Sequence, residues 1–450
     1  MSERQQAPAT RPVSDVSAGV GLSGLFGLFL WIAICRNWAT IADLFAFPGP
    51  RAPMSGAYAA LLTLAFTSLP MIAWSVLVDK VHRRASTGID WTKPRRLSDT
   101  VDVSITKLAG LWATWAIIGF AYCVARWYWR DGYLFAMDVI GVAAVPLFVL
   151  SVPYVLWLDR VLINPRDGAW HFGAMLIGRE PYDIAEVKRH LLAWTVKGFF
   201  CAFMISILPG GFRAIVELDF ASIPADPVQL SWRLIDLLFL IDVQIGTVGY
   251  LMTLKPFDAQ IRSANPYLAG WVAALMCYPP FILMGEGGPL SYHEHSADWG
   301  IWLQGHTALL WVWGAVLVFL TAIYAWATVA FGLRFSNLTY RGVLTNGPYR
   351  FTRHPAYLSK NLFWWLSTLP FFATTGALTD VVRNTTIMAL VSAVYFWRAK
   401  TEEKHLLGED PKYRAYHAWM SENALITRSF NHLGRKLRER GQAQQVQPAE

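Results

Sequence analysis

Residues 306–331 read HTALLWVWGAVLVFLTAIYAWATVAF, a run that contains no Asp, Glu, Lys or Arg. A helix needs roughly 20 apolar residues to cross the hydrocarbon core of a bilayer, so this segment is long enough to span a membrane. Nine other segments are also long and apolar enough to span a membrane. The ten predicted spans are 18–35, 56–78, 105–125, 133–158, 191–208, 231–254, 266–284, 306–331, 358–374 and 381–397.

The composition agrees with such a chain. Of the 450 residues, 54% are hydrophobic and 16% are charged, whereas soluble domains carry about 25% charged residues. A soluble protein could not bury so much apolar surface, and a disordered chain would be far more polar. We therefore predict an all-α, polytopic helical bundle of about ten transmembrane helices. The four cysteines form no CxxC pair, so neither a zinc site nor a disulfide framework is expected.

The net charge of +8 is distributed unevenly along the chain. Most of the 39 Lys and Arg residues lie in the N-terminal tail, in alternate loops and after residue 397. Basic residues mark cytoplasmic loops, so we expect a multi-pass protein with both termini in the cytoplasm, whichever membrane holds it. The first span, 18–35, has no cleavage site and is interpreted as an uncleaved anchor. Orientation and lipid attraction explain the charge, and no nucleic-acid partner is needed.

Several polar residues fall at bilayer depth, where they are costly and are functional candidates by default. They are Asp138, Lys197, Asp236, Asp242 and Gln244. Two readings stay open for them: polar contacts that hold helices together, and contacts to the headgroup of a substrate.

A loop between two predicted spans contains His293, Glu294, His295 and Asp298, which suggests a metal site at first sight. An HxH pair alone is a weak signal, because no second His cluster accompanies it. We therefore favour a solvated loop and predict no metal.

The C-terminal third is different in character. Residues 334–357 read RFSNLTYRGVLTNGPYRFTRHPAY, in which Asn-Gly-Pro at 346–348 signals a turn and Pro355 begins a helix. Residues 398–407 read RAKTEEKHLL, with Arg398 and Glu402 four positions apart on one helix face. The first segment could receive an anionic group at a helix N-terminus, and the second alone could be a solvated face of ordinary salt bridges.

Taken together, the two segments resemble the isoprenylcysteine carboxyl methyltransferase family and its phospholipid methyltransferase relatives. The resemblance extends from residue 333 to 420. It rests on Gly347, Tyr349, Arg353, His354, Pro355, Tyr357, Arg398, Thr401, Glu402, Glu403, Tyr413 and Tyr416. The family often has Gly two positions after the Tyr of its His-Pro segment, where this chain has Ser359.

The resemblance implies a membrane methyltransferase that binds S-adenosylmethionine on the cytosolic side without a Rossmann domain. It assigns cofactor contacts to Gly347, Tyr349, His354, Pro355, Tyr357, Glu402 and Glu403. Arg398 and Arg353 are the candidate catalytic residues, with Arg398 also a candidate ligand for a carboxylate of substrate or cofactor.

The predicted organisation is an N-terminal tail at 1–17, a membrane region of unassigned role at 18–331, the methyltransferase-like region at 332–420, and a basic, partly disordered tail at 421–450. The predicted substrate is a lipid or prenylated acceptor that arrives from the bilayer. One alternative is an NADPH-dependent, sterol-type membrane reductase. Another is a non-catalytic transporter or scaffold, in which Lys197, Asp236 and Asp242 would line a water-filled path.

Overall fold

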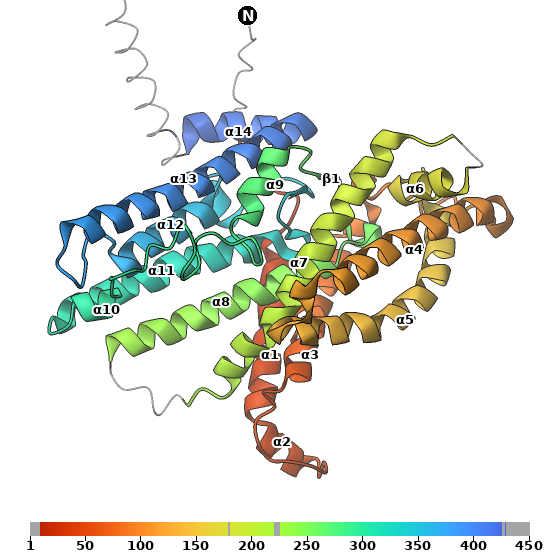
Figure 1. Ribbon diagram of the computed structural model, residues 1–450. Helices are drawn as coiled ribbons and strands as arrows, with labels where there is room; N and C mark the ends of the chain where they lie inside the picture. The colour runs from red at the N-terminus through yellow and green to blue at the C-terminus, as the bar shows by residue number, and fades with distance from the viewer. Residues whose placement is uncertain (1–9, 179–180, 220–225, 425–427, 429–450) are drawn as a thin grey trace, which may run out of the picture.

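A computed structural model describes residues 10–178, 181–219, 226–424 and 428 (Figure 1). The first nine residues and most of the predicted tail at 421–450 lie outside this range. The helices are α1 (Ala18–Arg36), α2 (Trp38–Leu44), α3 (Ala57–Ala73), α4 (Val101–Val124), α5 (Asp131–Val161), α6 (Gly168–Ile177), α7 (Ile184–Val216), α8 (Pro227–Leu251), α9 (Leu268–Leu275), α10 (Trp299–Trp302), α11 (Thr307–Phe331), α12 (Pro355–Thr368), α13 (Leu378–Glu409) and α14 (Pro411–Asn423). Two short strands, β1 (Ser263–Ala264) and β2 (Thr339–Tyr340), pair antiparallel.

Seven helices within the described residues are long and apolar enough to cross a membrane. These are α1, α3 with its continuation to Val78, α4, α5, α7, α8 and α11 with its continuation to Arg334. They correspond to seven of the ten predicted spans, and the prediction of an all-α membrane bundle is confirmed. The other three predicted spans differ from regular transmembrane helices.

Residues 266–284 are not a spanning helix. Only α9 is helical there, and the chain then continues through turns to α10. Pro279 and Pro280 explain this, because proline supplies no backbone N–H and clashes with the preceding helical turn. The segment nevertheless returns across the bundle, since β1 pairs with β2 beyond the end of α11 while α10 directly precedes its start.

The last two predicted spans form a hairpin of unequal helices. α12 has 14 residues, about 21 Å at 1.5 Å per residue, which is short of a bilayer. α13 has 32 residues, but no stretch of it is apolar enough to count as a span. At the turn of the hairpin the Thr374 amide donates to the His295 carbonyl at 2.8 Å, and Asn384 Nδ2 donates to the Glu294 carbonyl at 2.7 Å. The hairpin thus reaches the face that carries the loop before α10.

Helix α8 lies at the centre of the bundle. It packs against α7 on one side and α11 on the other, and α11 in turn packs against α12 (Figure 1). The largest buried apolar cluster joins α1, α3, α7, α8 and α11. The α12–α13 hairpin is therefore attached to the rest of the molecule chiefly through α11.

The segment before α1 meets α14 at the other end of the described chain. Lys412 Nζ pairs with Asp15 Oδ1, and the Arg11 guanidinium lies 5.9 Å from the centre of the Trp419 ring. Both ends of the described chain therefore lie on one face, as an even number of passages requires.

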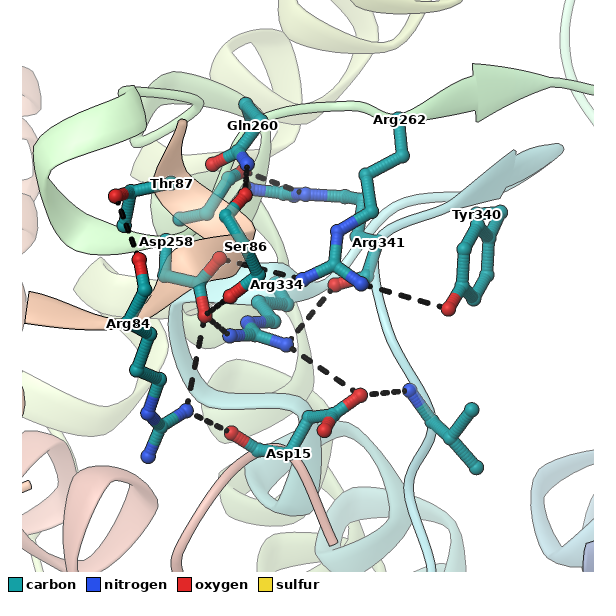
Figure 2. Close-up of polar contacts among 12 residues, drawn as sticks. Asp15, Arg84, Ser86, Thr87, Asp258, Gln260, Arg262, Arg334, Tyr340 and Arg341 are labelled. Carbon is teal, nitrogen blue, oxygen red and sulfur yellow. Dashed lines mark hydrogen bonds and ion pairs between the residues drawn. The ribbon is translucent and has the colours of Figure 1, made fainter. Parts of the chain in front are cut away.

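On this same face, Asp258 joins three separate stretches of chain (Figure 2). It is 1% exposed and accepts from Arg334 Nη2 at 2.5 Å and Ser86 Oγ at 2.8 Å. Arg262 Nη2 lies 3.2 Å from its second oxygen, and Arg84 Nη1 lies 3.7 Å from the first. One carboxylate thus neutralises cations from the loop after α3, the β1 loop and the end of α11.

Arg341 lies beside this cluster, and its guanidinium binds backbone carbonyls rather than side chains. Its guanidinium donates to the carbonyls of Gly249, Met252, Ala259, Leu333 and Phe335. Helices end with carbonyls that lack intrahelical partners, and those of α8 and of the turn after α11 meet here. A cation at a helix C-terminus also suits the helix dipole, so Arg341 fixes where α8 and α11 end relative to each other.

We predict that Asp258→Asn lowers the free energy of unfolding by about 3–5 kcal/mol, because it removes the nearest counter-charge of the buried Arg334 guanidinium and leaves only Asp15 Oδ2, at 3.9 Å. Denaturant unfolding in a mild detergent measures the change. Asp43→Asn is the matched control, since Asp43 pairs with Arg51 on an exposed surface and such pairs contribute about 0–1 kcal/mol. Equal losses in the two variants would contradict the role given to Asp258.

Candidate functional site

A cavity of about 180 Å³ lies between α11, the 332–349 loop, α12 and the second half of α13. Eight of the residues on which the resemblance rests line it. They are Tyr349, Arg353, His354, Tyr357, Arg398, Glu402, Tyr413 and Tyr416. The structure thus brings together two segments that are separated by the helical hairpin.

Glu402 stands in the cavity wall between an aromatic hydroxyl and a cation. Its Oε1 accepts from the Tyr357 hydroxyl and lies 3.4 Å from Arg398 Nε. Both contacts fall on the same carboxylate oxygen, and Oε2 has no recorded partner among the described residues. Glu402 therefore retains acceptor capacity toward the cavity.

Arg398 is 2% exposed and is held from three sides. Its Nη2 donates to Asn337 Oδ1 at 2.6 Å. The guanidinium carbon lies 5.0 Å from the centre of the Tyr357 ring and 5.5 Å from that of Tyr278. Asn337 is itself fixed by the Tyr250 hydroxyl, which accepts from its backbone N–H at 2.9 Å. The guanidinium is thus oriented by fixed groups before any ligand binds.

Glu403 does not line the cavity but stands behind it. Its Oε1 lies 2.9 Å from Arg353 Nε and 3.0 Å from His354 Nε2, and its Oε2 lies 2.8 Å from Lys400 Nζ. Burial alone would raise the pKa of Glu403, but the His354 hydrogen bond and the neighbouring cations hold that pKa well below its usual range. Glu403 therefore positions the His354 and Arg353 side chains, which do line the cavity.

Gly347 and Pro355 act through the backbone and do not line the cavity. Gly347 has φ +53°, and Pro355 is the first residue of α12. Ser359, which stands where the family often has Gly, is buried and its hydroxyl donates to the Ala356 carbonyl at 3.3 Å. Tyr416 reaches the same region, since its hydroxyl donates to the Tyr349 carbonyl at 2.7 Å.

Sequence reasoning missed several cavity residues. Tyr278, Tyr324, Asn337, Lys360 and Tyr395 all line the cavity. Asn337 belongs to the polar segment 334–357 and could have been noticed there. Lys360 lies inside the predicted span 358–374, and a basic residue at that depth was a signal.

The N-terminal tail was also missed, and it braces the cavity wall from outside. The Asp15 amide donates to the Val343 carbonyl at 2.9 Å, and the Val343 amide donates back to Asp15 Oδ2 at 2.7 Å. Thr345 Oγ1 donates to the Pro12 carbonyl at 2.7 Å. Gly342, with φ +120°, is needed here because a Cβ would lie 2.3 Å from Arg334 Nη1. Residues 12–15 thus run along the loop whose inner side lines the cavity.

Three of the five polar residues predicted at bilayer depth have polar partners, whereas the buried amide of Gln244 has none among the described residues. Asp242 accepts from the Tyr324 hydroxyl at 2.8 Å and from Thr328, and Lys197 donates to Thr253 Oγ1 at 2.9 Å. Asp236 lies 3.5 Å from Arg233 on a half-exposed helix face. None of Asp242, Lys197 and Asp236 lines the cavity. The contacts of Asp242 and Lys197 match the reading of polar groups that hold helices together, whereas Asp236 pairs within its own helix, α8.

The loop that contains His293 and His295 accepts two hydrogen bonds at its backbone carbonyls, one from the Thr374 amide and one from Asn384 Nδ2. In the part of the chain that the structure describes, no group of three or more His, Cys, Asp or Glu side chains is arranged to hold a metal ion.

We predict a pH-dependent effect for Glu403→Gln. The folded-state pKa of Glu403 is depressed, so its charge stabilises the fold above its usual pKa of 4.5, and that stabilisation is lost as the pH falls further toward the folded-state value. The variant should be less stable than the wild type by about 1–3 kcal/mol at pH 7. This difference should shrink below about pH 4.5 in unfolding measurements, and a difference that does not depend on pH would refute the assignment.

Comparison with known families now adds to this geometry. Residues 308–408 match the model of the isoprenylcysteine carboxyl methyltransferase (ICMT) family. The match begins in α11, earlier than the resemblance noted in the sequence, and ends before α14. No curated protein and no solved structure matches the chain. The family match supports a membrane methyltransferase, and it covers residues 308–408 of this longer membrane chain.

Proposed function

We propose that this protein is an S-adenosylmethionine-dependent methyltransferase that acts on a lipid or isoprenylcysteine-type acceptor presented from the bilayer. The observation that carries the proposal is the convergence of the His354 segment and the Glu402 segment on one cavity inside the family-matched region. Neither segment alone would form a site.

The chemistry of the cavity wall suits this cofactor. S-adenosylmethionine carries an ammonium and a carboxylate at one end, ribose hydroxyls, an adenine ring and a positively charged sulfonium that donates the methyl group. Glu402 Oε2 can accept from an ammonium or from ribose hydroxyls, and the Arg398 guanidinium can hold a carboxylate. The aromatic faces of Tyr357 and Tyr278 suit a flat ring or a cation.

The remaining residues hold this arrangement in place. Glu403 fixes the imidazole of His354 at the cavity wall, and Asn337 fixes the guanidinium of Arg398. Arg353, one of the two candidate catalytic residues, is held by Glu403 and points into the same cavity. Methyl transfer to an anionic acceptor moves no proton, so alignment and a preorganised wall are the main requirements, which these residues meet.

We place the cavity opening on the cytoplasmic side. The N-terminal tail, the 79–104 loop and α14 share this face, and they belong to the basic stretches that the positive-inside rule assigns to the cytoplasm.

Two alternatives remain as outcomes of the test. A sterol-type reductase would bind NADPH at the same cavity, but the His-Pro step and the paired Glu402 and Glu403 favour a methyltransferase. A transporter or scaffold would need a path lined by Lys197, Asp236 and Asp242. Because these three side chains do not line the cavity, this alternative has less support.

Calorimetric titration of the detergent-purified protein with S-adenosylmethionine and with NADPH distinguishes the three functions. We expect S-adenosylmethionine to bind, and Glu402→Gln or His354→Ala to weaken its binding about 10- to 100-fold, as the loss of a hydrogen bond to a charged group would. Glu294→Gln, in the loop on the opposite face, is the control and should bind normally. NADPH binding instead would favour the reductase, and binding of neither ligand would favour a non-catalytic role.

A further inference from the structure

The loop at 342–345 forms part of the cavity wall, and it belongs to neither a helix nor a strand. It follows β2, and its first three residues line the cavity. Buried backbone groups outside helices and strands need partners elsewhere. Here the partners lie on the N-terminal tail: Asp15 exchanges two hydrogen bonds with Val343, and the Thr345 amide donates to Ser14 Oγ at 3.4 Å. The order of this part of the wall therefore depends on the tail.

Helix α14 contributes two tyrosines to the same cavity. It begins beyond the family-matched residues, which end at 408. Asp410, which caps the helix, accepts from the Tyr340 hydroxyl. Two residues further on, Lys412 Nζ pairs with Asp15 Oδ1. The tail and α14, which come from opposite ends of the described chain, thus meet beside the cavity.

Asp15 contacts both of these parts of the wall at once. Its Oδ2 accepts from the Val343 amide at 2.7 Å, while its Oδ1 pairs with Lys412. The side chain is 22% exposed, so salt screens these contacts less than it would on an open surface. On the other side, Arg84 Nη1 donates to the Asp15 carbonyl at 2.7 Å and Arg334 Nη1 lies 3.9 Å from Oδ2 (Figure 2). Asp15 is therefore a fixed point to which the loop and the helix are both attached.

We propose that Asp15 is a positioning residue for S-adenosylmethionine, because it holds the 342–345 loop and α14 together as one wall of the cofactor cavity. This inference rests on the proposed function and extends it to a part of the chain far from the family-matched residues. A site whose walls move binds its ligand with an affinity reduced by the fraction of time that they spend in the competent arrangement. Asp15 does not line the cavity, so it acts on affinity through the Val343 amide and Lys412.

Calorimetric titration of the full-length protein in detergent with S-adenosylmethionine measures this effect. We expect Asp15→Ala to weaken binding about tenfold, as a wall that is correctly arranged about a tenth of the time would. Asp15→Glu, which keeps the charge, should recover part of the affinity. In the double variant with Lys412→Ala, the fold-loss should be smaller than the product of the two single losses, since both substitutions break the same contact.

Hydrogen–deuterium exchange of the cofactor-free protein separates positioning from general stability. Asp15→Ala should exchange faster than the wild type at residues 342–345 and in the first turn of α14. The central helices α8 and α11 should exchange at the wild-type rate, because the tail contacts are local. Unchanged exchange at the loop and at α14 would overturn the inference, and so would faster exchange throughout the bundle, which is the mark of a merely structural role.

Ser17→Ala is the matched control. Ser17 belongs to the same tail, but its hydroxyl donates to Asp79 Oδ2 at 2.7 Å, and neither of these residues lines the cavity. The variant should bind S-adenosylmethionine as the wild type does. Full affinity in Asp15→Ala, or an equal loss in Ser17→Ala, contradicts the role given to Asp15. A wild type that binds no S-adenosylmethionine counts against the proposed function, and the exchange measurement then still decides whether Asp15 orders the loop and α14.

Discussion

A buried guanidinium needs a counter-charge or enough acceptors for its N–H groups. This chain meets that requirement twice where the ends of α8 and α11 meet. Arg334 receives the charge of Asp258, and Arg341 receives backbone carbonyls from the ends of α8 and α11. Both arginines line the cavity. The position of the cavity wall therefore depends on residues that lie far outside the family-matched segment.

This dependence gives part of the long N-terminal region a structural role. The loop after α3 contributes Arg84 and Ser86 to the Asp258 cluster, and the N-terminal tail pairs with the loop at 343–345. A compact family segment would have to brace its cavity by other means. Here the preceding helices and their loops form part of the support. The hairpin of α12 and α13 is held against them because α12 packs on α11.

The sequence predicted much of this fold because long apolar runs have few alternatives in a membrane. It failed at 266–284, where apolar composition suggested a helix that the prolines prevent. The resemblance joined His354 to the Glu402 segment, and the structure places both in one cavity. Asp258 and Asp15 could not be assigned in this way. Their partners lie far away along the chain, and single polar residues in loops have no periodicity that would reveal such contacts.

The pairing of the N-terminal tail with the 343–345 loop also has a consequence for biosynthesis. Residues 12–15 are made before their partners at 343–345, which follow more than 300 residues later along the chain. At about 5–20 residues per second this interval is on the order of tens of seconds. During that time residues 12–15 lack their partners at 343–345, and the cavity wall can be completed only after α12 and α13 have been made. Assembly of the site is therefore a late event that follows insertion of the preceding helices.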